Sequence, residues 1–247
     1  MTPRFYAPAL RPEGGEFGLP AEEAVHLTRV LRLGVGATVN VFDGQGLEYR
    51  ARVVHAERED VRLEAGDRVD PAAEPRVRVT LAQAVVKGEK MDGIIRDAVM
   101  LGVAAINPLL TARTDVPEVA LASGTRVERW RRIVISSVKQ CGRAVVPELS
   151  LPETLDACLR RGHDGLRLML VEPGAAADVT TGEALNGLSP AESAQVFVGP
   201  EGGWTPEEVS MAREAGCRLV TLGKRTLRAD ATPLIALGVL QYLWGDL

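Results

Sequence analysis

The chain has 247 residues, of which 46% are hydrophobic and 25% are charged, a composition typical of a globular protein and not of a disordered one. Its formal net charge of −4 weighs against nucleic-acid binding unless basic residues are concentrated locally, because phosphate contacts need Lys and Arg. The three cysteines are widely spaced and form no CxxC pair or zinc spacing, which favours a reducing compartment and predicts no metal site.

The ends of the sequence carry no sign of a membrane or of secretion. The first residues lack the apolar core of a signal peptide, and the longest apolar run, from Pro233 to Trp244, is too short to span a bilayer. We therefore expect a cytoplasmic protein that has no membrane contact.

Residues 1–70 are predicted to form a small β-rich domain. A turn at 43–46 between two runs of strand-forming residues indicates a hairpin. The expected helix lies at 22–31 and the expected strands at 38–42, 47–55 and 61–69. Residues 71–75, with two prolines and no apolar periodicity, are predicted to be a linker.

Residues 76–247 alternate between short apolar runs and helical patterns. The runs are bounded by helix breakers and are typical of buried strands. We expect strands at 77–85, 103–106, 166–171, 195–198 and 218–222, and helices at 90–101 and 125–142. Two more helices are expected to start at Thr205-Pro206 and at Thr232-Pro233, because a capping residue followed by proline marks a helix start. This alternation predicts an α/β domain with a parallel sheet.

Two loops follow buried strands of this domain and lead into helices. The first is the glycine-rich segment 199–204, and the second is the basic segment 222–230. Ligands of open α/β sheets bind at the carboxyl ends of strands, and glycine allows a close backbone approach. Neither loop matches a Walker or GxGxxG motif. Each loop therefore has two interpretations: a wall of a ligand pocket, or a simple connection exposed to solvent.

The predicted helix 125–142 has one apolar and one basic face. Six basic residues and one acidic residue lie between Arg126 and Arg143, a local charge of +5. With about 100° per residue, the apolar face comprises Val127, Trp130, Val134, Val138 and Cys141. The candidate RNA-binding residues are Arg129, Arg132, Lys139 and Arg143 on the opposite face, with Lys87, Lys90 and Arg113 as extensions. The alternative interpretation is a solvated helix face.

Taken together, the motifs resemble the RsmE family, bacterial methyltransferases that modify N3 of a uridine in 16S ribosomal RNA. The resemblance extends over nearly the whole chain. The motifs that carry it are Lys87-Gly88-Glu89-Lys90, Gln140-Cys141-Gly142-Arg143, Val198-Gly199-Pro200-Glu201-Gly202-Gly203 and Leu222-Gly223-Lys224-Arg225-Thr226-Leu227-Arg228. The chain departs from the family pattern at Asp97 and Met100, where Lys and Glu are usual, and at 229–231, where Ala-Asp-Ala replaces Thr-Glu-Thr.

The resemblance implies a SPOUT-type parallel sheet with a trefoil knot in residues 76–247 and a PUA-like, RNA-binding β-barrel in residues 1–70. It also implies a homodimer that binds S-adenosyl-L-methionine and acts on the 16S ribosomal RNA of the small subunit. The implied cofactor contacts are Leu170, Val171, Glu172, Gly199, Pro200, Glu201, Gly202, Leu222, Gly223, Leu227 and Arg228.

The catalytic residues that we expect are Arg228 and Asp230. Uracil N3 must lose a proton before it can attack a methyl group, and Arg228 is suited to stabilise the resulting anion, with Arg143 or Arg113 as other candidates. Asp230 would orient Arg228 or accept the proton. Three other functions remain possible: a SPOUT methyltransferase with another RNA target, a non-catalytic RNA-binding or ribosome-assembly protein, and a nucleotide-dependent oxidoreductase. The last is disfavoured because no GxGxxG turn follows Val85.

Overall fold

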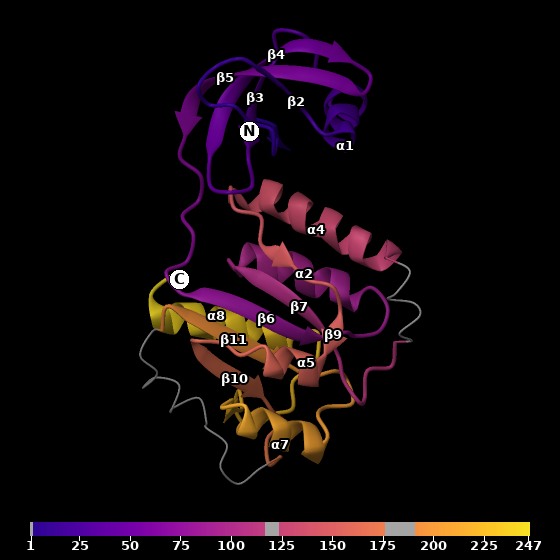
Figure 1. Cartoon of the computed structure of the whole chain (residues 1–247), viewed down its shortest axis with the longest axis vertical. Helices are drawn as coiled ribbons and strands as arrows, with labels where there is room; N and C mark the ends of the chain where they lie inside the picture. Colours follow the sequence, from indigo (N-terminus) through magenta and orange to yellow (C-terminus); the bar gives the residue numbers. More distant parts are fainter. Residues whose placement is uncertain (1, 117–123, 176–190) are drawn as a thin grey trace. The chain divides into compact units, whose positions relative to one another are not determined.

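A computed structural model describes residues 2–116, 124–175 and 191–247 of the chain. The chain divides into two compact units, whose elements are labelled in Figure 1. Unit 1 comprises Met1–Glu74 and Ile135–Val146, and unit 2 comprises Pro75–Val134 and Pro147–Leu247. The division expected from the sequence assigned residues 135–146 to the second domain, whereas the structure places them in unit 1.

Unit 1 is built on a five-stranded sheet with the order β1-β3-β4-β5-β2. The predicted hairpin is confirmed, because β3 (Thr38–Phe42) pairs antiparallel with β4 (Glu48–Glu57), which pairs antiparallel with β5 (Asp60–Val69). The sequence patterns missed β1 (Arg4–Tyr6) and β2 (Glu16–Gly18). Three-residue strands are too short to show an alternating pattern.

The core of unit 1 follows from alternation along its strands, whose successive side chains point to opposite faces of the sheet. Buried side chains include Phe5, Phe17, Leu27, Val39, Val41, Val53, Val61 and Leu63. The expected helix is present as α1 (Ala21–Val25), but its continuation over His26–Val30 is a π-helix.

The last turns of helix α4 (Thr125–Cys141) are held in unit 1 by Arg4. Its guanidinium Nη1 donates to the carbonyl oxygens of Val138 at 2.9 Å and Lys139 at 2.7 Å, and its Nη2 donates to Glu48 at 2.7 Å. The final carbonyl groups of a helix have no partner within the helix, so a cation that binds them stabilises its end. This contact explains why a segment distant in sequence belongs to unit 1.

Unit 2 contains a parallel sheet, as predicted. Within the described residues the sheet has seven strands, and its main path runs β12-β10-β11-β6-β7-β8, with β9 also paired to β7. All of these pairings are parallel. The strands are β6 (Arg78–Ala84), β7 (Ala105–Leu110), β8 (Glu148–Leu149), β9 (Glu153–Thr154), β10 (Leu166–Leu170), β11 (Ser193–Val198) and β12 (Arg218–Val220).

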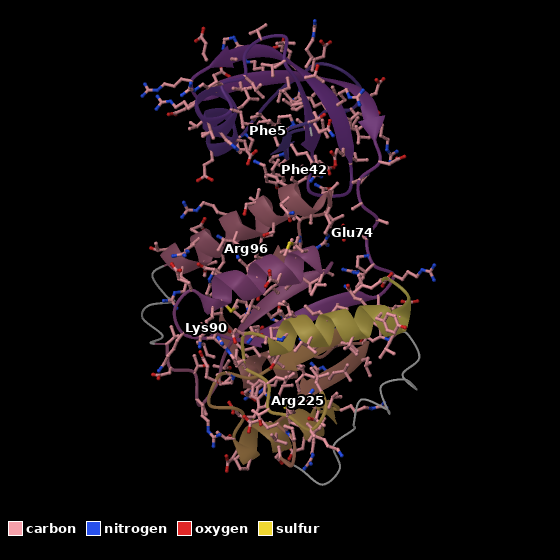
Figure 2. The ribbon with its side chains drawn as sticks, turned by 180° about the vertical axis from the view of Figure 1, so that it is seen from behind. Phe5, Phe42, Glu74, Lys90, Arg96 and Arg225 are labelled. Atoms are coloured by element: carbon pink, nitrogen blue, oxygen red, sulfur yellow. The ribbon has the colours of Figure 1, made fainter. Side chains whose placement is uncertain are left out.

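Helices cover both faces of this sheet. Helices α2 (Lys90–Met100) and α8 (Thr232–Trp244) pack against each other and lie in front of the sheet in Figure 2. Helices α5 (Leu155–Arg160) and α7 (Pro206–Glu214) share a hydrophobic cluster with the other face. Burial on both faces explains why these strands appear in the sequence as continuous apolar runs.

The two predicted helix starts have different outcomes. Thr205 caps α7 as expected, because its hydroxyl accepts from the Glu208 N–H and the Glu208 carboxylate accepts from the Thr205 N–H at 2.8 Å. Thr232 does not cap α8, whose N-cap position is held by Ala231. The Thr232 hydroxyl instead donates to the carbonyl oxygen of Arg228 at 2.8 Å, which fixes the end of the preceding loop.

Candidate active site

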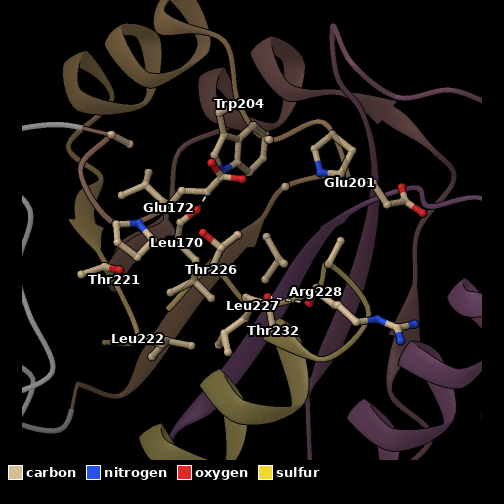
Figure 3. Close-up of a pocket in the computed structure, with 18 of the residues that line it drawn as sticks. Leu170, Glu172, Glu201, Trp204, Thr221, Leu222, Thr226, Leu227, Arg228 and Thr232 are labelled. Carbon is tan, nitrogen blue, oxygen red and sulfur yellow. Dashed lines mark hydrogen bonds between the residues drawn. The ribbon is translucent and has the colours of Figure 1, made fainter. Parts of the chain in front are cut away.

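A pocket of about 400 Å³ lies where three neighbouring strands of unit 2 end. Strands β12, β10 and β11 are adjacent and parallel, so the loops after them meet at one edge of the sheet (Figure 3). Residues 170–175, 198–204 and 221–230 supply most of its walls. The residue patterns predicted the second and third loops, and the resemblance alone predicted the first.

Most of the implied cofactor residues line this pocket. Those that do are Leu170, Val171, Glu172, Gly199, Pro200, Glu201, Leu222, Leu227 and Arg228. Gly202 and Gly223 are not among the lining residues. A side chain at Gly202 would bring its Cβ within 3.1 Å of the Cβ of Arg113, so this glycine makes room for a neighbouring side chain. Gly223 adopts a φ of 96°, which a side chain would strain.

Trp204 belongs to the predicted glycine-rich segment 199–204 but was not among the implied cofactor contacts. Its indole N–H donates to the Leu170 carbonyl oxygen at 2.8 Å and so joins the loop after β11 to the end of β10 (Figure 3). A Cβ at Gly199 would lie 3.1 Å from the indole ring, which explains the glycine. The sequence signal was a large aromatic residue directly after a glycine-rich loop. The other lining residues outside the implied cofactor contacts are Pro173, Ala175, Val198, Gly203, Val209, Thr221, Arg225, Thr226, Ala229 and Thr232.

Arg113 lines the pocket but is bonded to its wall. Its Nη1 donates to the carbonyl oxygens of Gly202 at 2.7 Å and Trp204 at 3.3 Å. Beside it, the N–H of Ala112 donates to the buried Glu208 carboxylate at 2.8 Å. The loop after β7 is therefore fixed to the loop after β11, and Arg113 acts first as a support for the site.

Arg228 and Asp230 form a two-point ion pair at the pocket. Arg228 Nε donates to Asp230 Oδ1 at 3.0 Å, and Nη2 donates to Oδ2 at 2.7 Å. The hydrogen bonds from Arg228 lower the pKa of Asp230 below its ordinary value, because they favour the charged carboxylate. The two predicted catalytic residues thus lie together, and the carboxylate holds the guanidinium in a fixed plane.

Lys90 and Glu201 form a second ion pair at the pocket. Lys90 Nζ donates to Glu201 Oε1 at 2.8 Å, and the backbone N–H of Lys87 reaches the same oxygen at 3.4 Å. Burial alone would raise the pKa of Glu201, but the hydrogen bond from Lys90 and the backbone hydrogen bonds outweigh burial and lower it. Lys90, predicted as an RNA contact, is therefore paired within the protein.

The structure does not form the continuous exposed basic stripe expected along α4. Val127, Trp130, Val134 and Val138 are buried as predicted, but most of the opposite cations are paired with carboxylates. The Arg143 side chain is only 4% exposed and the Lys139 side chain 15%. The pairs are Arg129 with Asp92 and Glu89, Lys139 with Glu23, Arg143 with Glu74, and, in the extension, Lys87 with Asp115. Arg132 is exposed.

Two further features bear on the kind of protein. In residues 2–116, 124–175 and 191–247, no group of three or more His, Cys, Asp or Glu side chains is placed to hold a metal ion. None of the helices in these ranges is long and apolar enough to cross a membrane.

Comparison with known proteins identifies the family. A family model described as an RNA methyltransferase domain matches residues 73–241, and a model described as an RNA methyltransferase PUA domain matches residues 19–66. The chain is 34% identical over 220 residues to ribosomal RNA small subunit methyltransferase E of a Synechocystis species, which covers 88% of this chain and 70% of the relative. It is 30% identical to the Mycobacterium bovis protein of the same name, with 97% and 91% covered.

Solved structures agree with the sequence comparisons. Ribosomal RNA small subunit methyltransferase E from Neisseria gonorrhoeae, bound to S-adenosyl methionine, matches with a TM-score of 0.84 and 32% identity over 99% of this chain and 98% of that one. A methyltransferase from Legionella pneumophila, in complex with the same cofactor, matches with a TM-score of 0.88 and 30% identity over 98% of both chains. The fold is therefore a SPOUT-type α/β domain with an N-terminal PUA domain, and this chain belongs to the RsmE family of RNA methyltransferases.

Proposed function

We propose that this protein transfers a methyl group from S-adenosyl-L-methionine to N3 of a uridine in 16S ribosomal RNA of the small ribosomal subunit, as a homodimer in the cytoplasm. The observation that carries the proposal is the pocket at the ends of β10, β11 and β12, which has a charged group, Arg228, beside an apolar recess. The names of the relatives and the cofactor in two similar structures support it.

The pocket fits the proposed cofactor in size and chemistry. A volume of about 400 Å³ lies within the range of small-ligand sites. Leu170, Leu222 and Leu227 offer apolar surface for a flat adenine ring (Figure 3). Glu172, which has no ion-pair partner in the described part of the chain, offers a carboxylate to a ribose hydroxyl or to an ammonium group. S-adenosyl-L-methionine would supply an electrophilic methyl group.

Arg228 is suited to act on the base. Uracil N3 is nucleophilic only after it loses its proton, and the charge then spreads to the two carbonyl oxygens. A guanidinium group beside those oxygens stabilises the anion. Asp230 keeps Arg228 in place through two hydrogen bonds. Because its lowered pKa makes it a weaker base, we assign Asp230 the role of positioning Arg228 and not that of accepting the proton.

Helix α8 supports the proposed dimer. Ile235, Val239 and Tyr242 are 40%, 37% and 71% exposed, and their spacing of four and three residues places them on one face of the helix. An exposed apolar stripe of this kind is typical of an interface. We expect Val239→Asp to shift the protein from dimer to monomer in analytical ultracentrifugation. A wild-type protein that is monomeric at micromolar concentration would contradict the proposal of a dimer.

A second candidate is methylation of another RNA, because nothing in the pocket identifies the sequence around the target base. A non-catalytic RNA-binding protein is a weaker candidate, since the pocket and both of its ion pairs are intact.

The decisive experiment is transfer of labelled methyl from S-adenosyl-L-methionine to small ribosomal subunits that lack the modification, followed by nucleoside analysis. We expect labelled 3-methyluridine. Labelling of transfer RNA but not of subunits would favour the second candidate. Failure to bind the cofactor would favour the non-catalytic protein.

A further inference from the structure

Four basic side chains line the pocket, and three of them are already bonded within the protein. Lys90 is paired with Glu201, Arg228 is paired with Asp230, and Arg113 donates to two backbone carbonyl groups. The fourth is Arg225. In the part of the chain that the structure describes, no carboxylate or carbonyl oxygen accepts from its guanidinium. Among the basic side chains that line the pocket, Arg225 is therefore the one with no ion-pair or hydrogen-bond partner in the described residues.

The loop that carries Arg225 is fixed at both ends and exposed at its tip. At the first end, the Thr221 hydroxyl donates to the Gly223 carbonyl oxygen at 3.2 Å. At the other end, the N–H of Thr232 donates to the Arg228 carbonyl oxygen at 2.9 Å. Residues 223–226 between these anchors are exposed. A cation on such a loop is held near the pocket without being neutralised.

Side chains of this loop point in two directions. Leu222 and Leu227 are half-buried and line the apolar recess (Figure 3). Lys224 and Arg225, by contrast, are exposed, and Arg225 also borders the pocket. Lys224, like Arg225, has no ion-pair partner within the described ranges. One short loop therefore presents an apolar side to the recess and two unpaired cations to the solvent at its rim.

We propose that Arg225, assisted by Lys224, binds a backbone phosphate of the RNA strand next to the base that enters the pocket. The inference rests on the proposed function, which requires that an RNA base reach this pocket. An exposed guanidinium binds a phosphate through two parallel hydrogen bonds. Each nucleotide of an RNA strand carries a phosphate, whereas the proposed cofactor carries none and has a positively charged sulfonium. The carboxylate of the cofactor is the rival acceptor for Arg225, and a measurement of cofactor affinity distinguishes the two. Arg225 is then a positioning residue, because it fixes the strand and leaves the reacting atoms to other groups.

Arg96 provides a matched control. It is also an exposed arginine of unit 2 for which the described residues offer no ion-pair partner, but it lies on α2 and does not line the pocket (Figure 2). If exposed positive charge alone held the RNA, Arg96→Ala and Arg225→Ala would weaken binding equally. If the position at the rim matters, only Arg225→Ala would have a large effect.

The test measures the affinity of wild type, Arg225→Ala, Arg225→Lys, Lys224→Ala and Arg96→Ala for a single-stranded oligouridylate and for small ribosomal subunits, at several salt concentrations. The affinity for S-adenosyl-L-methionine is measured in parallel by calorimetry. We expect Arg225→Ala to weaken RNA binding about tenfold and to make the slope of log affinity against log salt shallower by about 0.7. Arg225→Lys should restore most of the slope, and cofactor affinity should stay within about twofold in every variant.

In the methyl-transfer assay, Arg225→Ala should raise the KM for subunits with little change in kcat. Equal RNA affinities for Arg225→Ala and Arg96→Ala would overturn the inference, as would a loss of cofactor affinity that matches the loss of RNA affinity. Failure of wild type to bind either RNA would overturn it as well. If subunits are bound in this way but no 3-methyluridine forms, the proposed function fails in its target while the phosphate contact stands.

Discussion

Helix α4 and the loop after β12 are both rich in basic residues, but they differ in whether those residues form ion pairs within the protein. Arg129 and Lys139 on α4, and Arg143 just after it, are paired with carboxylates that lie far away in the sequence. On the loop, Lys224 and Arg225 are exposed and, among the described residues, unpaired. A local positive charge in a sequence therefore does not by itself predict a set of unpaired cations. Acidic residues that the fold brings to the same place decide whether the charge is available to a ligand.

Among substitutions in unit 2, we expect Leu227→Glu in the pocket to cause the largest loss of cofactor affinity. A carboxylate at this lining position would be desolvated against the adenine ring. We expect S-adenosyl-L-methionine affinity to fall by about a thousandfold, measured by calorimetry. Leu151→Glu is the control, because Leu151 is 66% exposed and does not line the pocket. Equal affinities for the two variants would mean that the cofactor binds elsewhere.

Arg228→Ala should remove catalysis more than binding. Loss of a charge that stabilises an anion in the transition state lowers kcat by about a hundredfold, and cofactor affinity should fall much less, because Arg228 is one of many residues that line the pocket. Asp230→Asn should have a smaller effect in the same direction, because it loosens Arg228 without removing it. Single-turnover methyl transfer measures both. A normal rate in Arg228→Ala would exclude this arginine from the chemistry.

The contrast between paired and exposed cations in the segment 126–143 can be tested through stability. Arg143 is buried and paired with Glu74, so Arg143→Ala should reduce the free energy of unfolding by about 3 kcal/mol. Arg132→Ala, on the exposed side, should change it by less than about 0.5 kcal/mol. Urea denaturation measures both. Equal small changes would show that Arg143, like Arg132, contributes no more to stability than a surface charge.

The smallest effect concerns pH. Asp230 and Glu201 both have lowered pKa values in the folded protein. Both carboxylates are therefore charged at neutral pH, and the stability that their charge contributes is lost only as the pH falls through the folded-state pKa. Between about pH 6 and 8, neither carboxylate changes protonation. The logarithm of kcat should therefore rise smoothly with pH as uridine N3 loses its proton. A bend in this window that disappears in Asp230→Asn would instead make Asp230 the base.

The elements of unit 2 were largely predictable because its strands are buried on both faces and its helices have clear starts. The strands around the pocket, β10, β11 and β12, occur within one to two residues of their predicted ends. Helix α5 and strands β8 and β9 were missed, since segments of two to six residues carry little periodic signal. The trefoil knot implied by the resemblance stays a prediction.

The sequence predicted the part of the site that depends on where the loops lie, but not the part that depends on contacts between side chains. The glycines of the first loop, and the position of both loops after buried strands, allowed a pocket to be considered at this edge, whereas the leucines came from the resemblance. Pairings between distant side chains, such as Lys90 with Glu201 and Arg143 with Glu74, depend on tertiary packing and leave no local pattern. Ion pairs engage five of the expected RNA-binding residues within the protein, namely Lys87, Lys90, Arg129, Lys139 and Arg143, whereas Arg132 is exposed.

The most direct test of where the RNA base meets the protein is photo-cross-linking of small-subunit RNA that carries 4-thiouridine at the methylated position, followed by mass spectrometry of the attached peptide. If the base enters the pocket at the ends of β10, β11 and β12, we expect cross-links to peptides that contain residues 199–204 or 222–230. Excess RNA without 4-thiouridine should reduce these cross-links. Cross-links confined to residues 126–143 would contradict it and would return the basic helix to the centre of RNA recognition.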